Sequence, residues 1–198
     1  MKKIIAVTLC LFLLSIPALA ADSAMDAVKK PLDKALAILD DPQFKDGQNA
    51  EKQKELLWEC IEEVFNFVEV GKRAVGRNWK KFTPAERKDF TDVFSRVLGD
   101  AYLSRIQEGY EGEDINYLGT EQGEKEDKAV VKTIIQRPGM EIPVDYSLLS
   151  RDGKWEVYDV KIEGISLVKN YRSQFDKILM NKKPAELIQD LKDKKEIK

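Results

Sequence analysis

Apolar residues in the first half of the chain recur at helical spacing. Leu57, Ile61 and Val64 follow one another at intervals of three or four residues, which places them on one face of a helix. Residues 25–39 have a similar apolar face. Residues 21–110 are therefore expected to be mainly helical, with each helix burying one side.

The clearest local signal is a helix start at residues 83–86. Thr83 can accept a hydrogen bond from the first turn, and Pro84 suits the first helical position. Glu86 can reach back to the Thr83 amide and complete a capping box. This signal predicts a long amphipathic helix that ends near Gly109.

The pattern changes from helical to alternating after about residue 110. Alternation of apolar and polar residues is typical of strands with one buried face. Turn residues separate these segments at Gly123, 138–139 and 152–153. Residues 111–163 should therefore form about four strands joined by hairpins, which makes a curved antiparallel sheet.

Two further helices are expected in residues 164–198. Apolar residues return to helical spacing from Leu167 and again after Pro184. Helices, then a sheet, then helices indicate an α+β fold. We expect residues 21–198 to form a single domain.

The first twenty residues have the three parts of a secretory signal peptide. Lys2 and Lys3 supply positive charge. Residues 4–16 form an apolar run, and residues 17–20 end in small residues suited to cleavage. A membrane-spanning helix needs about 20 apolar residues, so this run is too short to be an anchor. We expect residues 1–20 to be removed during export, leaving a protein without stable membrane insertion.

Charge and residue types exclude several functions. The formal charge is −2, and loss of Lys2 and Lys3 makes it about −4. An acidic protein does not suit nucleic acid or an anionic membrane surface. The chain has no histidine, and only Cys60 remains after cleavage. A histidine base, a metal site of the zinc type and an internal disulfide are therefore excluded.

Two patterns resemble parts of enzyme sites. Ser166 follows a glycine two positions earlier, but without a histidine to activate it, it is better explained as a helix N-cap. Asp145 and Asp159 each adjoin a tyrosine. A curved sheet can use such a pair for proton abstraction, as ketosteroid isomerase does, so an isomerase-type enzyme stays an alternative.

Apolar and aromatic residues on the strands and on the later helices form two layers that should face each other. The candidates on the strands are Tyr117, Val131, Ile134, Val144, Tyr146 and Val157. Those on the helices are Tyr102, Ile106, Leu167, Val168, Tyr171 and Phe175. If the layers lie apart, they line a cavity for an apolar ligand; if they close, a pure adaptor that binds only proteins is the alternative.

Two blocks of the sequence form a known pattern. The first reads Ala-Val-Gly-Arg-Asn-Trp at 74–79 and leads into Thr-Pro-Ala-Glu-Arg at 83–87. The second and more specific block comprises Pro-Val-Asp-Tyr at 143–146, Trp-Glu-Val-Tyr-Asp-Val at 155–160 and Glu-Gly-Ile-Ser-Leu-Val at 163–168. Over roughly residues 25–192 the chain resembles the MlaC family of toluene-tolerance proteins.

The resemblance implies an NTF2-like fold whose sheet and helices enclose an apolar pocket for acyl chains. It also implies pocket contacts from Tyr102 and from Ile165. Members of this family are periplasmic phospholipid carriers of Gram-negative bacteria, acting between an outer-membrane lipoprotein–porin complex and an inner-membrane ABC transporter.

These implications lead to an expected function. The protein should be a monomeric, non-enzymatic shuttle in the periplasm that maintains outer-membrane lipid asymmetry. It should carry phospholipid as cargo and need no cofactor or metal. A hopanoid-associated branch shares the family pattern, so a hopanoid or another apolar lipid stays an alternative cargo.

Overall fold

The computed structural model describes residues 23–47 and 49–193. Its helical elements are α1 (Ala24–Asp40), η1 (Pro42–Gly47), α2 (Ala50–Val64), α3 (Phe67–Val75), η2 (Gly76–Lys81), α4 (Pro84–Gly109), α5 (Leu167–Leu179) and α6 (Pro184–Lys192). Its strands are β1 (Asp114–Gln122), β2 (Lys128–Arg137), β3 (Met140–Arg151), β4 (Lys154–Ile162) and β5 (Ile165–Ser166). The expected signal peptide, residues 1–20, lies outside the described residues.

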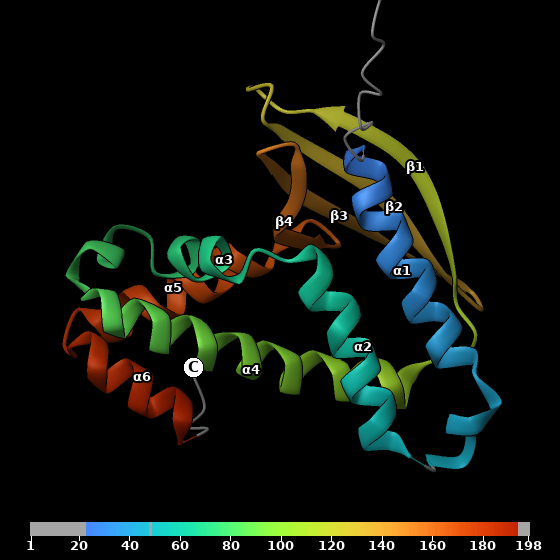
Figure 1. Ribbon diagram of the computed structural model, residues 1–198, viewed down its shortest axis with the longest axis horizontal. Helices are drawn as coiled ribbons and strands as arrows, with labels where there is room; N and C mark the ends of the chain where they lie inside the picture. The colour runs from blue at the N-terminus through green and yellow to red at the C-terminus, as the bar shows by residue number, and fades with distance from the viewer. Residues whose placement is uncertain (1–22, 48, 194–198) are drawn as a thin grey trace, which may run out of the picture.

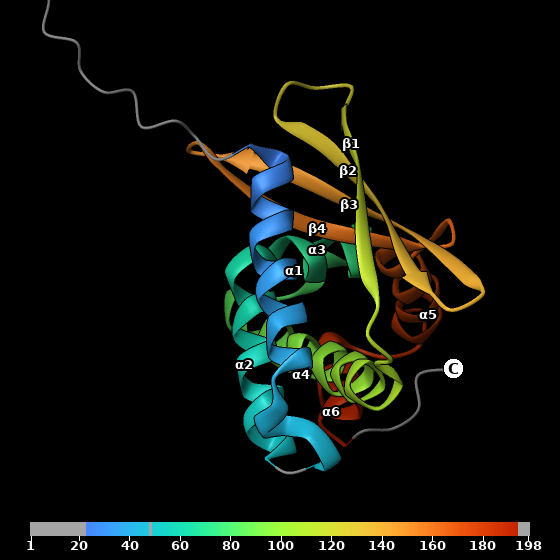
Figure 2. The ribbon, with the colours of Figure 1, turned by 90° about the vertical axis from the view of Figure 1, so that its right-hand side faces the viewer.

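The strands form one antiparallel sheet in the order β1-β2-β3-β4-β5. Each long strand pairs with the next one in sequence, as the turn residues predict. β5 is only two residues long and adds a fifth strand beside β4. The register shifts after Tyr117 in β1 and after Ser147 in β3. Such bulges increase strand twist, which is consistent with the curved sheet in Figure 2. The predicted α+β class is confirmed.

The start of α4 is set by its local sequence. The Glu86 amide donates to Thr83 Oγ1 at 3.2 Å, and the Thr83 amide donates to Glu86 Oε2 at 2.8 Å. The predicted capping box is therefore present, and the helix runs to Gly109. Within α4, a Cβ on Gly99 would lie 2.8 Å from the Trp58 ring, so glycine allows α2 to cross closely.

The helices divide into two groups (Figure 1). One core, formed with α3, α4, α5 and α6, contains stacked and edge-on rings of Phe90, Phe94 and Phe175. A second core lies where α1 contacts the inner face of the sheet and includes Val28 and Val131. α2 packs beside α1. Together with α4, these two helices lie opposite the inner face of the sheet (Figure 2).

Candidate functional site

A cavity of about 370 Å³ lies between the inner face of the sheet and helices α1, α2 and α4. All but three of its lining residues are aliphatic or aromatic. They are Leu32, Ala35, Leu36, Leu39, Leu57, Ile61, Tyr102, Leu103, Arg105, Ile106, Tyr110, Glu113, Ile115, Ile135, Arg137, Ile142, Val144, Tyr146 and Ile162. The volume lies in the usual range of small-molecule sites, about 300–1,000 Å³. We call this space the apolar cavity.

Helix α1 supplies one wall of the apolar cavity. Its N-terminal half buries Val28 and Pro31. Its C-terminal half presents Leu32, Leu36 and Leu39, which stay half-buried and line the cavity. The apolar face of an amphipathic helix needs an apolar neighbour. In this half of α1 the apolar face borders the cavity. A ligand with apolar chains would supply the missing apolar contacts.

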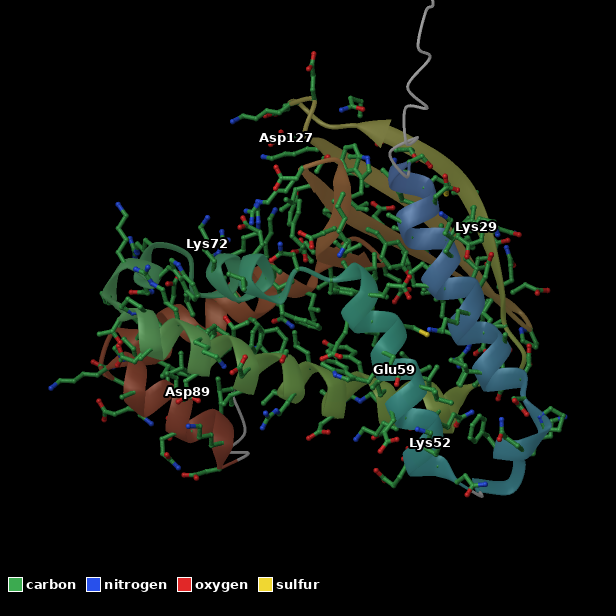
Figure 3. The ribbon with its side chains drawn as sticks, in the orientation of Figure 1. Lys29, Lys52, Glu59, Lys72, Asp89 and Asp127 are labelled. Carbon is green, nitrogen blue, oxygen red and sulfur yellow. The ribbon has the colours of Figure 1, made fainter. Side chains whose placement is uncertain are left out.

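Two hydrogen bonds fasten α1 next to the apolar cavity. The Tyr117 hydroxyl donates to Asp33 at 2.8 Å, and the Tyr110 hydroxyl donates to Asp40 at 2.8 Å. The Lys29 ammonium lies 4.4 Å from the centre of the Tyr117 ring, on the side of α1 that faces β1 (Figure 3). Burial, and then the Asp33 carboxylate, raise the pKa of Tyr117, so its hydroxyl stays a donor.

The three charged lining residues lie at the C-terminal end of α4. Arg137 donates through Nε to the Glu113 carboxylate and through Nη2 to the Gly109 carbonyl. Glu113 is buried and also accepts the Glu111 amide at 2.9 Å. Burial alone would raise the pKa of Glu113, but the amide and the guanidinium lower it. Glu113 therefore stays ionised and holds Arg137 at the end of α4. Arg105, the other cation of the lining, lies on α4 one turn before Gly109.

The rest of the apolar cavity carries no ionised side chain among its lining residues. Burial raises the pKa of Tyr146 on β3. Burial likewise raises the pKa of Tyr102 on α4. Both hydroxyls are therefore neutral at physiological pH, and neither can act as a base. The interior suits acyl chains better than a charged substrate.

The structure brings together four of the residues expected to bind a lipid. Tyr102 and Ile106 of α4 and Val144 and Tyr146 of β3 line the apolar cavity. Tyr117 lies beside it and holds α1 in place. Contact of these residues with a lipid stays a prediction.

Four other expected residues lie elsewhere. Val131 and Val157 are fully buried between the sheet and α1. Ile134 points to the opposite face of the sheet, because side chains alternate along a strand and its neighbour Ile135 lines the cavity. Ile165 lies on the short strand β5 and is 68% exposed.

Four expected residues on α5 belong to the helical core. Val168 and Phe175 are buried there, and Leu167 and Tyr171 pack against it. α5 packs more extensively against α3 than against β4, and none of its residues lines the apolar cavity. The expected arrangement of α5 facing the sheet across one cavity is therefore corrected.

Several cavity residues escaped the sequence analysis. Leu36 on α1 and Leu57 on α2 have a visible helical period, but that period does not distinguish a packed face from a cavity wall. Ile135 and Ile142 are register partners on β2 and β3. Both line the cavity, and the alternation of the strands could have revealed them if the inner face had been assigned correctly.

The carboxylates considered for catalysis have structural positions. Asp159 accepts the Ser166 hydroxyl at 2.6 Å and the Val168 amide at 3.0 Å. Ser166 in turn accepts the Lys169 amide at 3.0 Å, which confirms it as the N-cap of α5. Asp145 lies between two cavity-lining residues of β3 and therefore points to the other face of the sheet. None of these groups lines the apolar cavity.

The described residues offer no metal site, no membrane-spanning helix and no activated thiol. Residues 23–47 and 49–193 contain no group of three His, Cys, Asp or Glu that could hold a metal ion. In the same part of the chain, no helix is long and apolar enough to cross a membrane. Cys60 is buried, and burial raises its pKa, so its thiol is not activated.

A second hollow of about 690 Å³ lies among η1, the start of α2 and the end of α4. It shares Leu39 and Tyr110 with the apolar cavity. Polar groups line much of it, and two of them, Gln53 and Gln107, are hydrogen-bonded to each other at 2.9 Å. The apolar cavity is therefore the better candidate for an apolar ligand.

Comparison with known proteins agrees with this geometry. The model of the MlaC protein family matches residues 29–193. A solved structure of the phospholipid-binding protein from Ralstonia solanacearum, in complex with a phospholipid, is similar to the chain. The two are 26% identical, the match covers 87% of this chain and 96% of that chain, and the TM-score is 0.76. This likeness confirms the expected NTF2-like α+β architecture. The match over most of its length shows that the chain belongs to the MlaC protein family.

Proposed function

We propose that this protein binds a phospholipid in the apolar cavity and carries it through the periplasm between the outer and inner membranes. The observation that carries this proposal is the apolar cavity itself, with aliphatic walls on three helices and the sheet. The phospholipid complex of the Ralstonia solanacearum relative supports the same ligand class.

The energetics explain why a carrier is needed. A diacyl lipid has about thirty methylenes, and each costs about 0.8 kcal/mol to expose to water. The total is on the order of 25 kcal/mol, which prevents free lipid from crossing an aqueous gap at a useful rate. A protein interior as apolar as a bilayer makes the exchange nearly neutral. No catalytic group is needed for this task.

The partners follow from the same reasoning. A carrier that exchanges lipid at nearly equal free energy sets no direction of transport. Direction must come from a partner that consumes energy, and an inner-membrane ABC transporter meets this need. An outer-membrane lipoprotein–porin complex would be the partner at the other membrane. The proposed carrier then works as a non-enzymatic monomer that helps to maintain outer-membrane lipid asymmetry.

Lipid extraction tests the ligand class. We expect organic extracts of the purified protein, analysed by mass spectrometry, to contain phospholipid. A protein that carries no lipid and takes up none from phospholipid vesicles would contradict the proposal. Recovery of a hopanoid in place of phospholipid would favour the alternative cargo.

A charge on the cavity wall tests the site. Leu36→Glu should lower the amount of bound phospholipid at least tenfold, because an unpaired carboxylate in an apolar site costs several kcal/mol. Ala37→Glu adds the same charge to the next residue of α1, which is exposed and outside the lining. This control should bind lipid normally. Equal lipid content in both variants would show that the lipid lies elsewhere.

A further inference from the structure

The apolar cavity opens at the C-terminal end of α4. Among its lining residues, only Arg105, Ile106 and Ile162 are exposed. The exposed fractions of Ile106 and Ile162 are 44% and 41%, although both are aliphatic. The remaining lining residues are buried or half-buried. A lipid with its chains inside would therefore place its polar end beside these three residues.

Arg137 lies at this opening with one edge of its guanidinium already used. Nε donates to Glu113 and Nη2 donates to the Gly109 carbonyl. Nη1 has no hydrogen-bond acceptor among residues 23–47 and 49–193, and the side chain is 35% exposed. A guanidinium has five N–H donors in a rigid fork. The edge that carries Nη1 is therefore held in a fixed orientation and is available to an anion.

Arg105 supplies a second cation to the lining of the apolar cavity. It lies one helical turn before Gly109, so it and the Arg137 contact share one face of α4. Within the described part of the chain, no carboxylate forms an ion pair with Arg105. Its side chain is exposed and reaches the lining of the cavity. Its charge acts on the neighbouring hydroxyls of Tyr102 and Tyr171 and lowers their pKa values against the larger effect of burial.

The charges at the opening define the anion that fits. Arg105 and Arg137 are positive, and the buried Glu113 carboxylate offsets one of these charges. Among the lining residues one positive charge therefore remains, and its sign is opposite to that of the single charge of a phosphodiester. Arginine also suits the geometry of phosphate oxygens, since it can donate two parallel hydrogen bonds.

We propose that Arg105 and Arg137 bind the phosphodiester of a lipid whose acyl chains occupy the apolar cavity, with Glu113 positioning Arg137. This assignment rests on the proposed function. The alcohol beyond the phosphate points into solvent, so the site requires the phosphodiester and discriminates weakly among the alcohols attached to it. An uncharged lipid gains nothing from this pair of arginines.

A pair of lipids with the same acyl chains tests the assignment. The purified protein is incubated with vesicles that contain either phosphatidylglycerol or diacylglycerol, and the retained lipid is measured by mass spectrometry. The unmodified protein should retain phosphatidylglycerol preferentially. Arg105→Gln should weaken this retention about five- to tenfold, as expected for one charge-assisted hydrogen bond at a partly exposed site. Retention of diacylglycerol should not change.

Control variants separate the possible causes. Arg96→Gln removes an exposed arginine nine residues earlier on α4, about two and a half turns away and so on the opposite side. It should leave the preference intact. Arg137→Gln would leave Glu113 buried without its cation, so Glu113→Gln/Arg137→Gln is the suitable variant and should also lose the preference.

The outcomes distinguish this assignment from the proposed function. An unchanged preference in both Arg105→Gln and Glu113→Gln/Arg137→Gln would overturn the assignment while leaving the carrier function intact. An equal loss in Arg96→Gln would also overturn it, because general surface charge would then explain the effect. Retention of neither lipid by the unmodified protein would overturn the carrier function and the assignment with it.

Discussion

Asp159 shows how a buried carboxylate can serve structure alone. One oxygen accepts the Ser166 hydroxyl, and the other accepts the Val168 amide. These bonds join β4 to the first turn of α5, where orphan amides of the helix need acceptors. Tyr158, its neighbour, lies under the Arg73 guanidinium at 3.8 Å. Neither side chain lines the apolar cavity, so this pair is not placed to transfer a proton to a ligand there.

Replacement of Asp159 tests this interpretation. Asp159→Asn should lower the free energy of unfolding by about 1–3 kcal/mol, because an amide cannot accept at both positions. Lipid retention should stay normal. Denaturant titration and lipid mass spectrometry would measure the two effects. Asp145→Asn, on the outer face of the sheet, is the matched control and should change stability by less than about 0.5 kcal/mol.

Two results would contradict the structural role of Asp159. Unchanged stability of Asp159→Asn would show that its two hydrogen bonds contribute little. Loss of cellular function with normal stability and normal lipid retention would favour the isomerase-type alternative.

At the scale of elements, α1 combines two environments in one helix. Its N-terminal half packs against the sheet through Val28, whereas its C-terminal half borders the apolar cavity. Hydrogen bonds from Tyr117 and Tyr110 hold that second half near β1 and the end of α4. A lipid that widens the cavity must work against these two bonds. We therefore expect them to control the rate of lipid exchange.

Removal of both hydroxyls tests this expectation. Tyr110→Phe/Tyr117→Phe should release lipid up to about thirtyfold faster, since each of the two hydrogen bonds contributes about 1 kcal/mol and the rings remain in place. Transfer of a fluorescent phospholipid to acceptor vesicles would measure the rate. Tyr158→Phe, outside the cavity lining, should transfer lipid at the normal rate. An unchanged rate in the double variant would show that α1 does not move during exchange.

At the scale of the whole molecule, the protein combines a packed helical core with the apolar cavity. Phe90, Phe94 and Phe175 pack ring against ring in that core. The aliphatic side chains that line the apolar cavity pack against the protein on one side and face the open space of the cavity on the other. The apolar surface that faces the cavity is not buried against other atoms, so it does not gain the free energy of burial. A bound lipid should therefore contribute to the stability of the fold.

Lipid removal provides the test. The delipidated protein should have a lower Tm than the purified protein, because a ligand that binds only the folded state stabilises it by mass action. Addition of phospholipid vesicles should restore the Tm, which differential scanning calorimetry would show. Leu36→Glu should show no increase of Tm with vesicles. Equal Tm values with and without lipid in the unmodified protein would contradict the role of lipid in stability.

The sequence by itself determined the features that depend on a few neighbouring residues. The capping box of Thr83 and Glu86 set the start of α4, and Ser166 set the start of α5. Turn residues near 138–139 and 152–153 set the order of the strands. These signals act through hydrogen bonds and backbone angles within one turn, so they need no tertiary information.

Only the tertiary structure decided which apolar residues fill a core and which line the cavity. Val28 and Leu36 lie on the apolar side of one helix, yet Val28 is buried and Leu36 faces the apolar cavity. Phe175 belongs to a helical repeat of apolar residues that was expected to line a cavity, but it is buried against α3 and α4. The physical reason is that hydrophobic burial is non-directional. The same periodic pattern satisfies a packed core or a lipid-binding wall, and the distance between the sheet and the helices selects between them.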